Sequence, residues 1–289
     1  LPFREKYIYH MDGVGYALAI NDFDILKDQP HPPGYPLYIF VARGFNFFFN
    51  DPHQSLVWLS ILSSIGAILG LYFFGKLFHS RRLGITAALL LLFNPVFWFN
   101  SQISMSYASE AFFVILTAYF LWQTMTGKRW LDVILAGLFL GLTAGVRPTS
   151  LMFLFPLFLY SLWFLKSEPR KIIGGFLALF LSITVWFIPF ILNTGLVNFL
   201  QTNALAGQWV FLTSLQAGSA ELWLENIKLF AIYLGLALNL GGLLIWRKLS
   251  IDRHKLMFLI VWAMPALAFY FLVHAPNSGY FLLPLPHST

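Results

Sequence analysis

Residues 55–78, SLVWLSILSSIGAILGLYFFGKLF, form an apolar run in which Lys76 is the single charged residue. A helix needs about 20 consecutive apolar residues to cross the hydrocarbon core of a bilayer, so this run predicts a membrane-spanning helix. Comparable runs follow at about residues 83–100, 105–125, 130–146, 149–166, 172–193, 227–247 and 256–274. The sequence therefore predicts an all-α, polytopic transmembrane protein with about eight spans.

The composition of the 289-residue chain supports this fold class. Hydrophobic residues make up 58% of the chain and charged residues only 10%, whereas soluble domains carry roughly 25% charged residues. The chain has no cysteine, which excludes disulfides and thiolate metal sites. Because the sequence has no internal repeat and no low-complexity linker, we expect one transmembrane domain over residues 1–289.

Residues 1–54 differ from the rest of this domain, and we expect them to form a first outer loop with interfacial helices. The apolar run at residues 34–50 is interrupted by Arg43 and is short for a span, so it predicts a helix lying in the membrane interface. The transmembrane helices occupy residues 55–289. The chain opens at Leu1 without a methionine or a preceding apolar segment, so we expect a truncated N-terminus. Whether helices follow Thr289 stays open.

Basic residues are distributed unevenly between the connections of the predicted spans. Nine of the 12 acidic residues lie in one set of connections, and 12 of the 18 basic residues lie in the alternate set: Lys76, Arg81, Arg82, Lys128, Arg129, Lys166, Arg170, Lys171, Arg247, Lys248, Arg253 and Lys255. The positive-inside rule places the basic connections in the cytoplasm. We expect the first loop and the connections near residues 100–106, 147, 194–226 and 275–280 to share the outer face.

Residues 12–36, DGVGYALAINDFDILKDQPHPPGYP, are the most polar long stretch of the chain. Four prolines within residues 30–36 fix φ and remove backbone donors, which excludes regular helix or sheet there. We expect the stretch to be a shaped loop. Shaped polar loops beside apolar helices are where membrane enzymes tend to keep their chemistry, so we expect the functional site here.

Three residues of this stretch are candidates for chemistry. Asp12 is followed by Gly13 and Gly15, which allow other backbone to come close, and a carboxylate is the usual general base for a hydroxyl or amine acceptor. A solvated loop acid or a helix N-cap would use the same residue type. Tyr16, four residues on, is a candidate substrate contact. His31 could bind a phosphate or donate a proton near neutral pH, or it could simply form hydrogen bonds within the turn.

Three further candidates lie at the outer ends of predicted spans. Glu110 falls just inside the 105–125 span, where an ionisable residue is costly unless it is partnered and is a functional candidate by default. The alternative is a helix-start acid favoured by the macrodipole. Tyr107 lies three residues earlier and shares its helix face. Arg147 lies at the junction of two spans, where a cation suits a phosphate or snorkels to the headgroups.

Asp22 and Asp24 form an Asp-x-Asp pair that could hold Mg²⁺ or Mn²⁺ against a diphosphate. Asp28 indicates that the loop is simply acidic, so a solvated face is the favoured interpretation and no cofactor is certain. Tyr280 belongs to residues 274–286, HAPNSGYFLLPLP, an outer turn followed by a Pro-broken apolar run. It could line a site, although a plain loop is the simpler interpretation.

Several segments carry a resemblance to a known family when they are taken in order. They are Asp12-Gly13, HPPGYPLY (31–38), GKLFHSRRLGITAALLLLFNPVFWFNSQ (75–102), Glu110 at the start of a span, GLTAGVRPTSLMFLFP (141–156) and SGYFLLPLP (278–286). This set resembles the GT-C superfamily of polytopic glycosyltransferases. The nearest branch is that of the bacterial protein mannosyltransferases and aminoarabinose transferases, similar to glycosyltransferase family 39. The resemblance covers most of the chain.

The resemblance implies transfer of a sugar from a polyprenyl-phosphate-linked donor to a lipid, glycan or protein acceptor. It implies an active site on the outer face of a bacterial inner membrane. Carried over, Asp12 would be the base or the carboxylate that orients the acceptor, His31 and Arg147 would face the donor phosphate, and Glu110 would line the cavity. The chain departs from the family pattern at His31, where many members have Lys, and at Gly279, where Arg is common.

Two other classes of protein compete with this interpretation. A transporter or lipid flippase predicts broken helices and polar residues near the bilayer midplane, whereas the acids of this chain gather at one face. A non-catalytic assembly subunit would have no use for the acidic loop. The basic residues lie in short clusters between apolar runs, which is an orientation pattern and gives no indication of nucleic-acid binding. One outward cavity joining Asp12, His31 and Arg147, with a groove open to lipid, would favour the enzyme.

Overall fold

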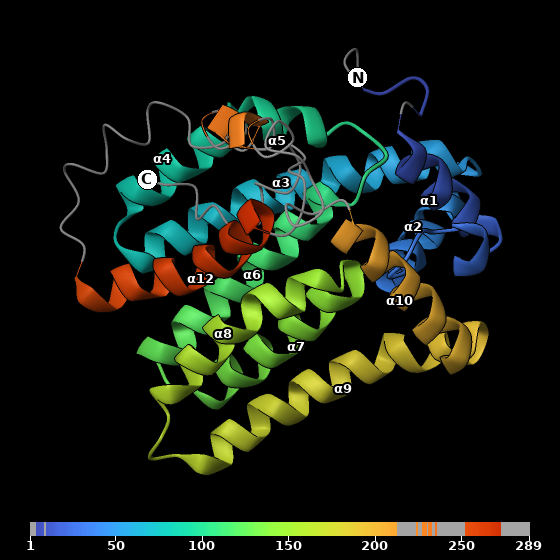
Figure 1. The fold of residues 1–289 in the computed structure, drawn as a ribbon. Helices are drawn as coiled ribbons and strands as arrows, with labels where there is room; N and C mark the ends of the chain where they lie inside the picture. Colours follow the sequence, from blue (N-terminus) through green and yellow to red (C-terminus); the bar gives the residue numbers. More distant parts are fainter. Residues whose placement is uncertain are drawn as a thin grey trace.

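The computed structural model describes residues 4–8, 10–212, 224, 227–229, 231–232, 235 and 252–272. In this part of the chain the backbone forms helices and connecting turns, with an isolated bridge between Asp24 and Gln29 (Figure 1). The expected all-α fold is confirmed. The helices are α1 (Met11–Asn21), the 3₁₀ helix η1 (Ile25–Lys27), α2 (Pro36–Phe49), α3 (Pro52–Phe78), α4 (Arg81–Leu92), α5 (Pro95–Asn100), α6 (Tyr107–Thr126), α7 (Trp130–Val146), α8 (Thr149–Trp163), α9 (Pro169–Thr194), α10 (Leu196–Leu212) and α12 (Arg253–Leu272).

Two of the described helices, α3 and α9, are long and apolar enough to cross a membrane by length and composition. α6 and α12 have 20 residues each, and α7 and α8 are shorter apolar helices of 17 and 15 residues. Helices therefore lie where most of the spans were expected. The span expected at residues 227–247 falls largely outside the described residues, and the number of eight spans stays a prediction.

The polar stretch begins with a helix, so the expectation of a loop is wrong for residues 12–21. His10 explains where α1 starts, because its Nδ1 accepts a hydrogen bond from the backbone N–H of Asp12 (3.2 Å). This contact satisfies one of the donors that a helix start leaves unpaired. The turn expected at residues 30–36 is confirmed, and Pro36 then opens α2. α2 is the helix that was expected at residues 34–50.

The span expected at residues 83–100 is also interrupted, so the expectation of one continuous helix is wrong there. Pro95 has no N–H to continue the helical hydrogen bonds and disfavours helical backbone in the residue before it. Asn94 is accordingly extended, with φ −71° and ψ 121°, and its side chain accepts a hydrogen bond from the N–H of Phe97 (2.9 Å). The chain therefore ends α4 and starts α5 at this point.

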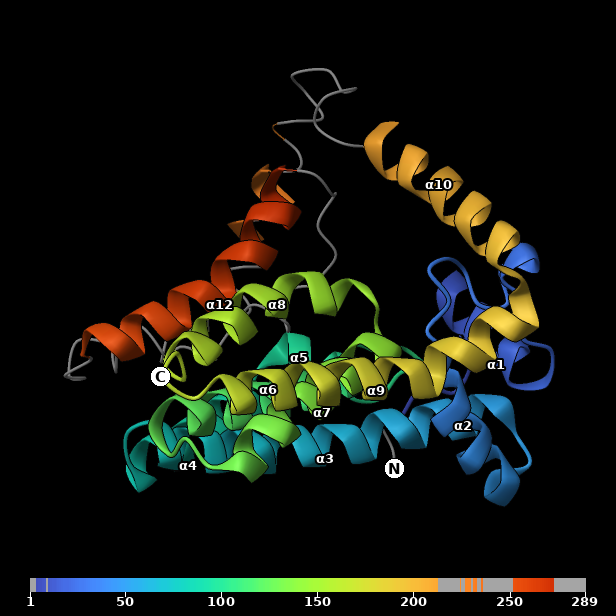
Figure 2. The ribbon, with the colours of Figure 1, turned by 90° about the horizontal axis from the view of Figure 1, so that it is seen from below.

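α7 and α9 lie side by side through small residues. A Cβ added to Gly137 would collide with the backbone carbonyl of Gly175, and a Cβ added to Gly141 would lie 2.6 Å from Cβ of Ser182. Ser182 also donates a hydrogen bond to the carbonyl of Leu138 (2.8 Å). Small residues let helix backbones approach closely where the hydrophobic effect cannot drive association. This contact fixes the course of α9, whose C-terminal half also contacts α2 (Figure 2).

Of the connections that were expected in the cytoplasm, the described parts lie at one end of the helices. Lys171 Nζ donates to the carbonyl of Lys128 (2.6 Å), which joins the α6–α7 connection to the start of α9. The rings of Phe164 and His254 lie 5.5 Å apart and join the end of α8 to the start of α12. The opposite end carries α1, α2 and the C-terminal end of α9 (Figure 2).

Candidate active site

Asp12 lies in the first turn of α1 with about a third of its side chain exposed. Its carboxylate lies between two histidines. Oδ1 is 3.7 Å from Nδ1 of His31, and Oδ2 is 3.6 Å from Nδ1 of His10. Since His10 and Asp12 belong to one helix start, the contact with His31 is the one that ties α1 to the Pro-rich turn.

The glycines after Asp12 allow the close approach that the sequence predicted. A Cβ added to Gly13 would lie 2.9 Å from Ser104 Oγ, and a Cβ added to Gly15 would lie 2.7 Å from the carbonyl oxygen of Asp28. Ser104 is itself held by the carboxylate of Glu5, which accepts hydrogen bonds from its N–H and its hydroxyl, both at 2.7 Å. α1 is therefore packed between the α5–α6 connection and the η1 turn. Sequence reasoning missed Glu5.

Tyr16 is buried at the centre of an aromatic group formed by α1, the turn and the start of α2. Its ring centroid lies 5.7 Å from that of His31, 5.1 Å from that of Tyr35 and 5.2 Å from that of Tyr38. Burial raises the pKa of Tyr16 well above its ordinary value, so the phenol stays neutral. Tyr35 has a left-handed backbone (φ 51°), which turns its side chain back towards the turn.

His31 is mostly buried and joins Asp12 to Tyr35. Its Nε2 lies 2.9 Å from the hydroxyl of Tyr35, which is a hydrogen-bond distance. Burial lowers the pKa of His31 below its ordinary value, and the charge of Arg147 lowers it further, while Asp12 and Asp28 act in the opposite direction. The imidazole is therefore neutral near pH 7.

Glu110 and Arg147 form a buried ion pair. Arg147 Nη1 lies 3.0 Å from Glu110 Oε2, and both side chains are more than nine-tenths buried. The hydroxyl of Ser150 donates to the other carboxylate oxygen of Glu110. The guanidinium also lies 5.0 Å from the centre of the Tyr107 ring, a cation–π distance. Tyr107 and Glu110 therefore lie on one face of α6, as expected, and both contact Arg147.

These contacts bring most of the predicted site residues to one end of the helices. Arg147 is within electrostatic range of both His31 and Tyr16, because its charge affects the pKa of each. Ser150 and Tyr35 belong to the same group and were missed by sequence reasoning, since their contacts with Glu110 and His31 arise only in the folded chain. Tyr280 lies outside the described residues.

The comparison with known families decides what this group of residues belongs to. The family model of the dolichyl-phosphate-mannose-protein mannosyltransferases matches residues 28–192, more than half of the chain. The chain belongs to this family. The sequence resemblance to GT-C glycosyltransferases is thus confirmed, and this mannosyltransferase-family chain is a membrane glycosyltransferase. Searches of the curated proteins and of the solved structures found no match.

The range that matches the mannosyltransferase family runs from just before the Pro-rich turn to the end of α9. It contains His31, Glu110 and Arg147, whereas Asp12 and Tyr16 lie before it. The positions of Asp12 and Tyr16 in the site therefore rest on the contacts described above. The role of each site residue stays a prediction.

Asp22 and Asp24 lie apart from Asp12, beyond the other end of α1, and share one cation. Lys27 Nζ lies 3.0 Å from Asp22 Oδ2 and 3.2 Å from Asp24 Oδ2. Asp24 also accepts a hydrogen bond from the N–H of Leu26 (3.0 Å) at the start of η1. Among the described residues no group of three His, Asp or Glu side chains could hold a metal ion. The local contacts favour a solvated acidic face, and divalent metal binding stays a prediction.

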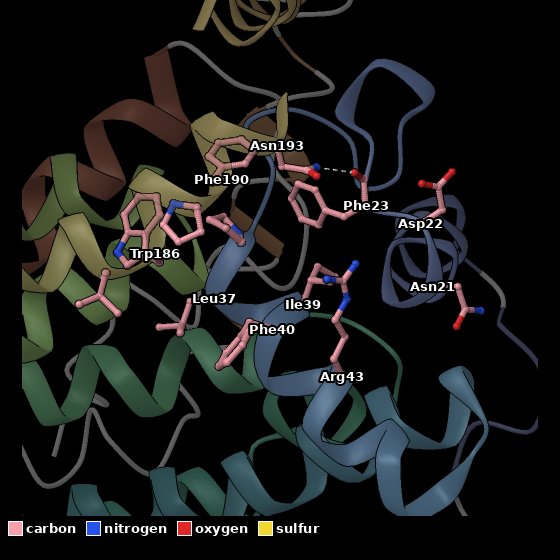
Figure 3. Close-up of a pocket in the computed structure, with 13 residues that line it drawn as sticks. Asn21, Asp22, Phe23, Leu37, Ile39, Phe40, Arg43, Trp186, Phe190 and Asn193 are labelled. Carbon is pink, nitrogen blue, oxygen red and sulfur yellow. Dashed lines mark hydrogen bonds between the residues drawn. The ribbon is translucent and has the colours of Figure 1, made fainter. Parts of the chain in front are cut away.

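A groove of about 520 Å³ lies between α2, α9 and the end of α1 (Figure 3). Arg43 lies at its edge and donates to the carbonyls of Ile20 (2.8 Å) and Ala19 (3.0 Å). Asn193 donates to the carbonyl of Phe23 (3.0 Å) and closes one end. The walls are mostly apolar and aromatic: Phe23, Pro36, Leu37, Ile39, Phe40, Val185, Trp186, Pro189 and Phe190.

One chain segment, from Gly34 to Leu37, lies between the groove and the cluster of ionisable residues that includes His31. A Cβ added to Gly34 would lie 2.8 Å from the ring of Phe190 in the groove. Tyr35, the next residue, contacts His31 on the other side. Asp12, His31 and Arg147 do not line this groove, so it is not the cavity that was expected to join these three residues.

Proposed function

We propose that this membrane glycosyltransferase moves a sugar from a polyprenyl-phosphate-linked donor to an acceptor hydroxyl or amine at the outer face of the membrane. The observation that carries the proposal is the Asp12 carboxylate beside a neutral His31, within range of the buried Arg147, in a chain of the mannosyltransferase family. Asp12 would take the acceptor proton as general base. The acceptor would be a lipid, a glycan or a protein.

Arg147 would act on the donor phosphate. When the glycosidic bond breaks, negative charge grows on the leaving phosphate, and a fixed cation stabilises that charge best where water is excluded. Glu110 holds the guanidinium in place and is itself held by the hydroxyl of Ser150, so Arg147 would need no reorganisation when the donor arrives. Tyr107 and Tyr16 would complete the polar lining.

The groove between α2 and α9 would take the polyprenyl chain of the donor. Its apolar walls are continuous with the exposed apolar side of α9, where Val185, Ile188 and Leu192 are 70%, 53% and 81% exposed. In a bilayer such a surface faces lipid, so the chain could enter from the membrane. The segment from Gly34 to Leu37 would then bring the phosphate near His31 and Arg147.

The outer-face location rests on charge. The basic connections gather at the end of the helices opposite α1 and α2, and the positive-inside rule assigns that end to the cytoplasm. The site would therefore face outwards, in a bacterial inner membrane if the resemblance to the bacterial branch holds.

The test is transfer of a labelled sugar by the purified chain in liposomes. A panel of polyprenyl-phosphate sugars would be offered with a mixed membrane acceptor, and labelled product would be counted. Asp12→Asn keeps the side-chain shape but cannot take a proton, so the rate should fall by about 10²–10⁴. Asp22→Asn is the matched control and should stay near the unmodified rate. Equal losses in the two variants would reject Asp12 as the base.

A further inference from the structure

His31 has two different neighbours at its two ring nitrogens. Nε2 lies at hydrogen-bond distance from the hydroxyl of Tyr35, and Nδ1 faces Oδ1 of Asp12 at 3.7 Å. Nδ1 is buried, and it has no hydrogen-bond partner among the described residues. A buried polar nitrogen without a partner is unfavourable, so this arrangement requires an explanation from function or from a bound molecule.

Neutral His31 can carry its proton on either ring nitrogen. If Nδ1 carries it, Nδ1–H points towards the Asp12 carboxylate and the hydroxyl of Tyr35 donates to Nε2. The relay proposed below requires the other tautomer. If Nε2 carries it, Nε2–H donates to the oxygen of Tyr35 and the lone pair of Nδ1 points towards Asp12. An ionised carboxylate can only accept hydrogen bonds, so it cannot bond to that lone pair. Once Asp12 is protonated its O–H can donate to Nδ1, and the orphaned acceptor gains its partner. The pair is thus poised to receive a proton at Asp12.

We propose that His31 is the second member of a proton relay, which takes from Asp12 the proton removed from the acceptor and passes it to the leaving phosphate. This inference rests on the proposed function. The acceptor oxygen forms a bond to the anomeric carbon, the bond from that carbon to the phosphate oxygen breaks, and its electron pair stays on the phosphate. The acceptor proton moves to Asp12 and then to Nδ1 of His31. The phosphate, which would otherwise leave with a second negative charge, takes this proton from Nδ1 of the imidazolium, so Asp12 returns to the carboxylate and His31 to the neutral Nε2–H form.

The charges around His31 predict how this relay depends on pH. Asp12 and His10 face it from α1, Asp28 from the η1 turn, Tyr35 from the start of α2, and Arg147 from the α7–α8 junction. Burial and Arg147 together outweigh the carboxylates and lower the pKa of His31. At neutral pH His31 is therefore neutral and can accept the proton from Asp12. As pH falls through this lowered pKa, His31 takes a proton from solvent and can no longer accept one from Asp12.

The first test compares pH profiles of sugar transfer for the unmodified chain and His31→Gln. Gln can keep a contact with Tyr35 but cannot relay a proton. We expect kcat to fall by about 10²-fold, the low end of what a positioned acid–base group contributes, with little change in KM for the donor. The acidic limb of the profile should also lose the part that comes from protonation of His31. His79→Gln, the same substitution at the residue that follows α3, is the matched control and should keep both rate and profile. An unchanged acidic limb in His31→Gln would overturn the relay.

The second test does not depend on turnover. The chain has seven histidines, and ¹⁵N-histidine NMR with His31→Gln for assignment reads the pKa and tautomer of His31 directly. We expect the Nε2–H tautomer, a pKa below the ordinary value, and a further fall in Asp12→Asn, because Asp12 is the nearest group that raises it. An Nδ1–H tautomer, or a pKa unchanged in Asp12→Asn, would reject the coupling. If the coupling is found and no donor in the panel is used, the proposed function is wrong, whereas the coupling between Asp12 and His31 is confirmed.

Discussion

The buried pair of Glu110 and Arg147 gives the sharpest test of the structure. Replacing Glu110 with Gln removes the charge that neutralises the guanidinium and leaves Arg147 charged in the interior, where it is 7% exposed. Removal of one partner of a buried ion pair typically costs about 3–5 kcal/mol. Gln can still accept a hydrogen bond from Arg147 or Ser150, so we expect the lower end of this range.

The measurement is thermal unfolding in detergent, followed by the fluorescence of the ten tryptophans. A change of 1 kcal/mol shifts Tm by about 2–4 °C in a domain of 150–250 residues, so a loss of about 3 kcal/mol in Glu110→Gln should lower Tm by roughly 6–12 °C. Glu168→Gln is the matched control. It breaks the pair with Lys171, in which Glu168 is 40% exposed, and exposed pairs are worth only about 0–1 kcal/mol.

A double variant separates the ion pair from the packing around it. Arg147→Met removes the orphaned charge while keeping an unbranched side chain, so Glu110→Gln with Arg147→Met should unfold at a higher temperature than Glu110→Gln alone. Two results would refute the reasoning. One is a Tm for Glu110→Gln equal to that of Glu168→Gln. The other is a double variant whose loss is the plain sum of the two single losses.

Four further predictions follow from the site and the topology. Single cysteines at positions 80 and 167, made from Ser80 and Ser167, should resist a membrane-impermeant thiol reagent added outside, and strong labelling would reverse the orientation. Arg147→Ala should raise KM for the lipid donor while Arg147→Lys retains part of the affinity as a point charge, and an unchanged KM would leave Arg147 a structural role. Chelation should change transfer little, and abolition by both chelator and Asp24→Asn would establish a metal. Val185→Trp should fill the groove and raise KM for a long-chain donor more than for a short-chain one, and equal effects would place the chain elsewhere.

The helices could be predicted because burial in lipid leaves a plain trace in sequence. An apolar run of the right length needs no knowledge of its neighbours, so α3, α6, α7, α8 and α9 fall close to the expected positions. The two errors have local causes. Pro95 interrupts a run that hydropathy alone treats as continuous, and His10 supplies the cap that allows a polar segment to start as a helix. Both signals are present in the sequence, but neither is a matter of hydrophobicity.

The ionisable residues could be found from sequence, but their pairings could not. Glu110 and Arg147 were each recognised because a charge near a membrane is costly, and that cost is what requires a partner. The partner is 37 residues away in the chain, and only the packing of α6 against α7 and α8 brings the two together. Arg147 was expected to face a donor phosphate or the outer headgroups, and the sequence did not indicate that it would also pair with Glu110.

The four carboxylates of the polar stretch show why local sequence ranks such residues poorly. Asp22 and Asp24 both form ion pairs with Lys27, which lies only a few residues along the chain. Ion pairs between residues so close in sequence need no tertiary structure. Asp12 has no ion pair with a Lys or Arg among the described residues, and beyond α1 it faces His31 of the Pro-rich turn. Asp12 meets one histidine, His10, within its own helix start and a second, His31, that the packing of another element places beside it. The contact with His31 distinguishes Asp12 from its acidic neighbours, and the proposed relay depends on it.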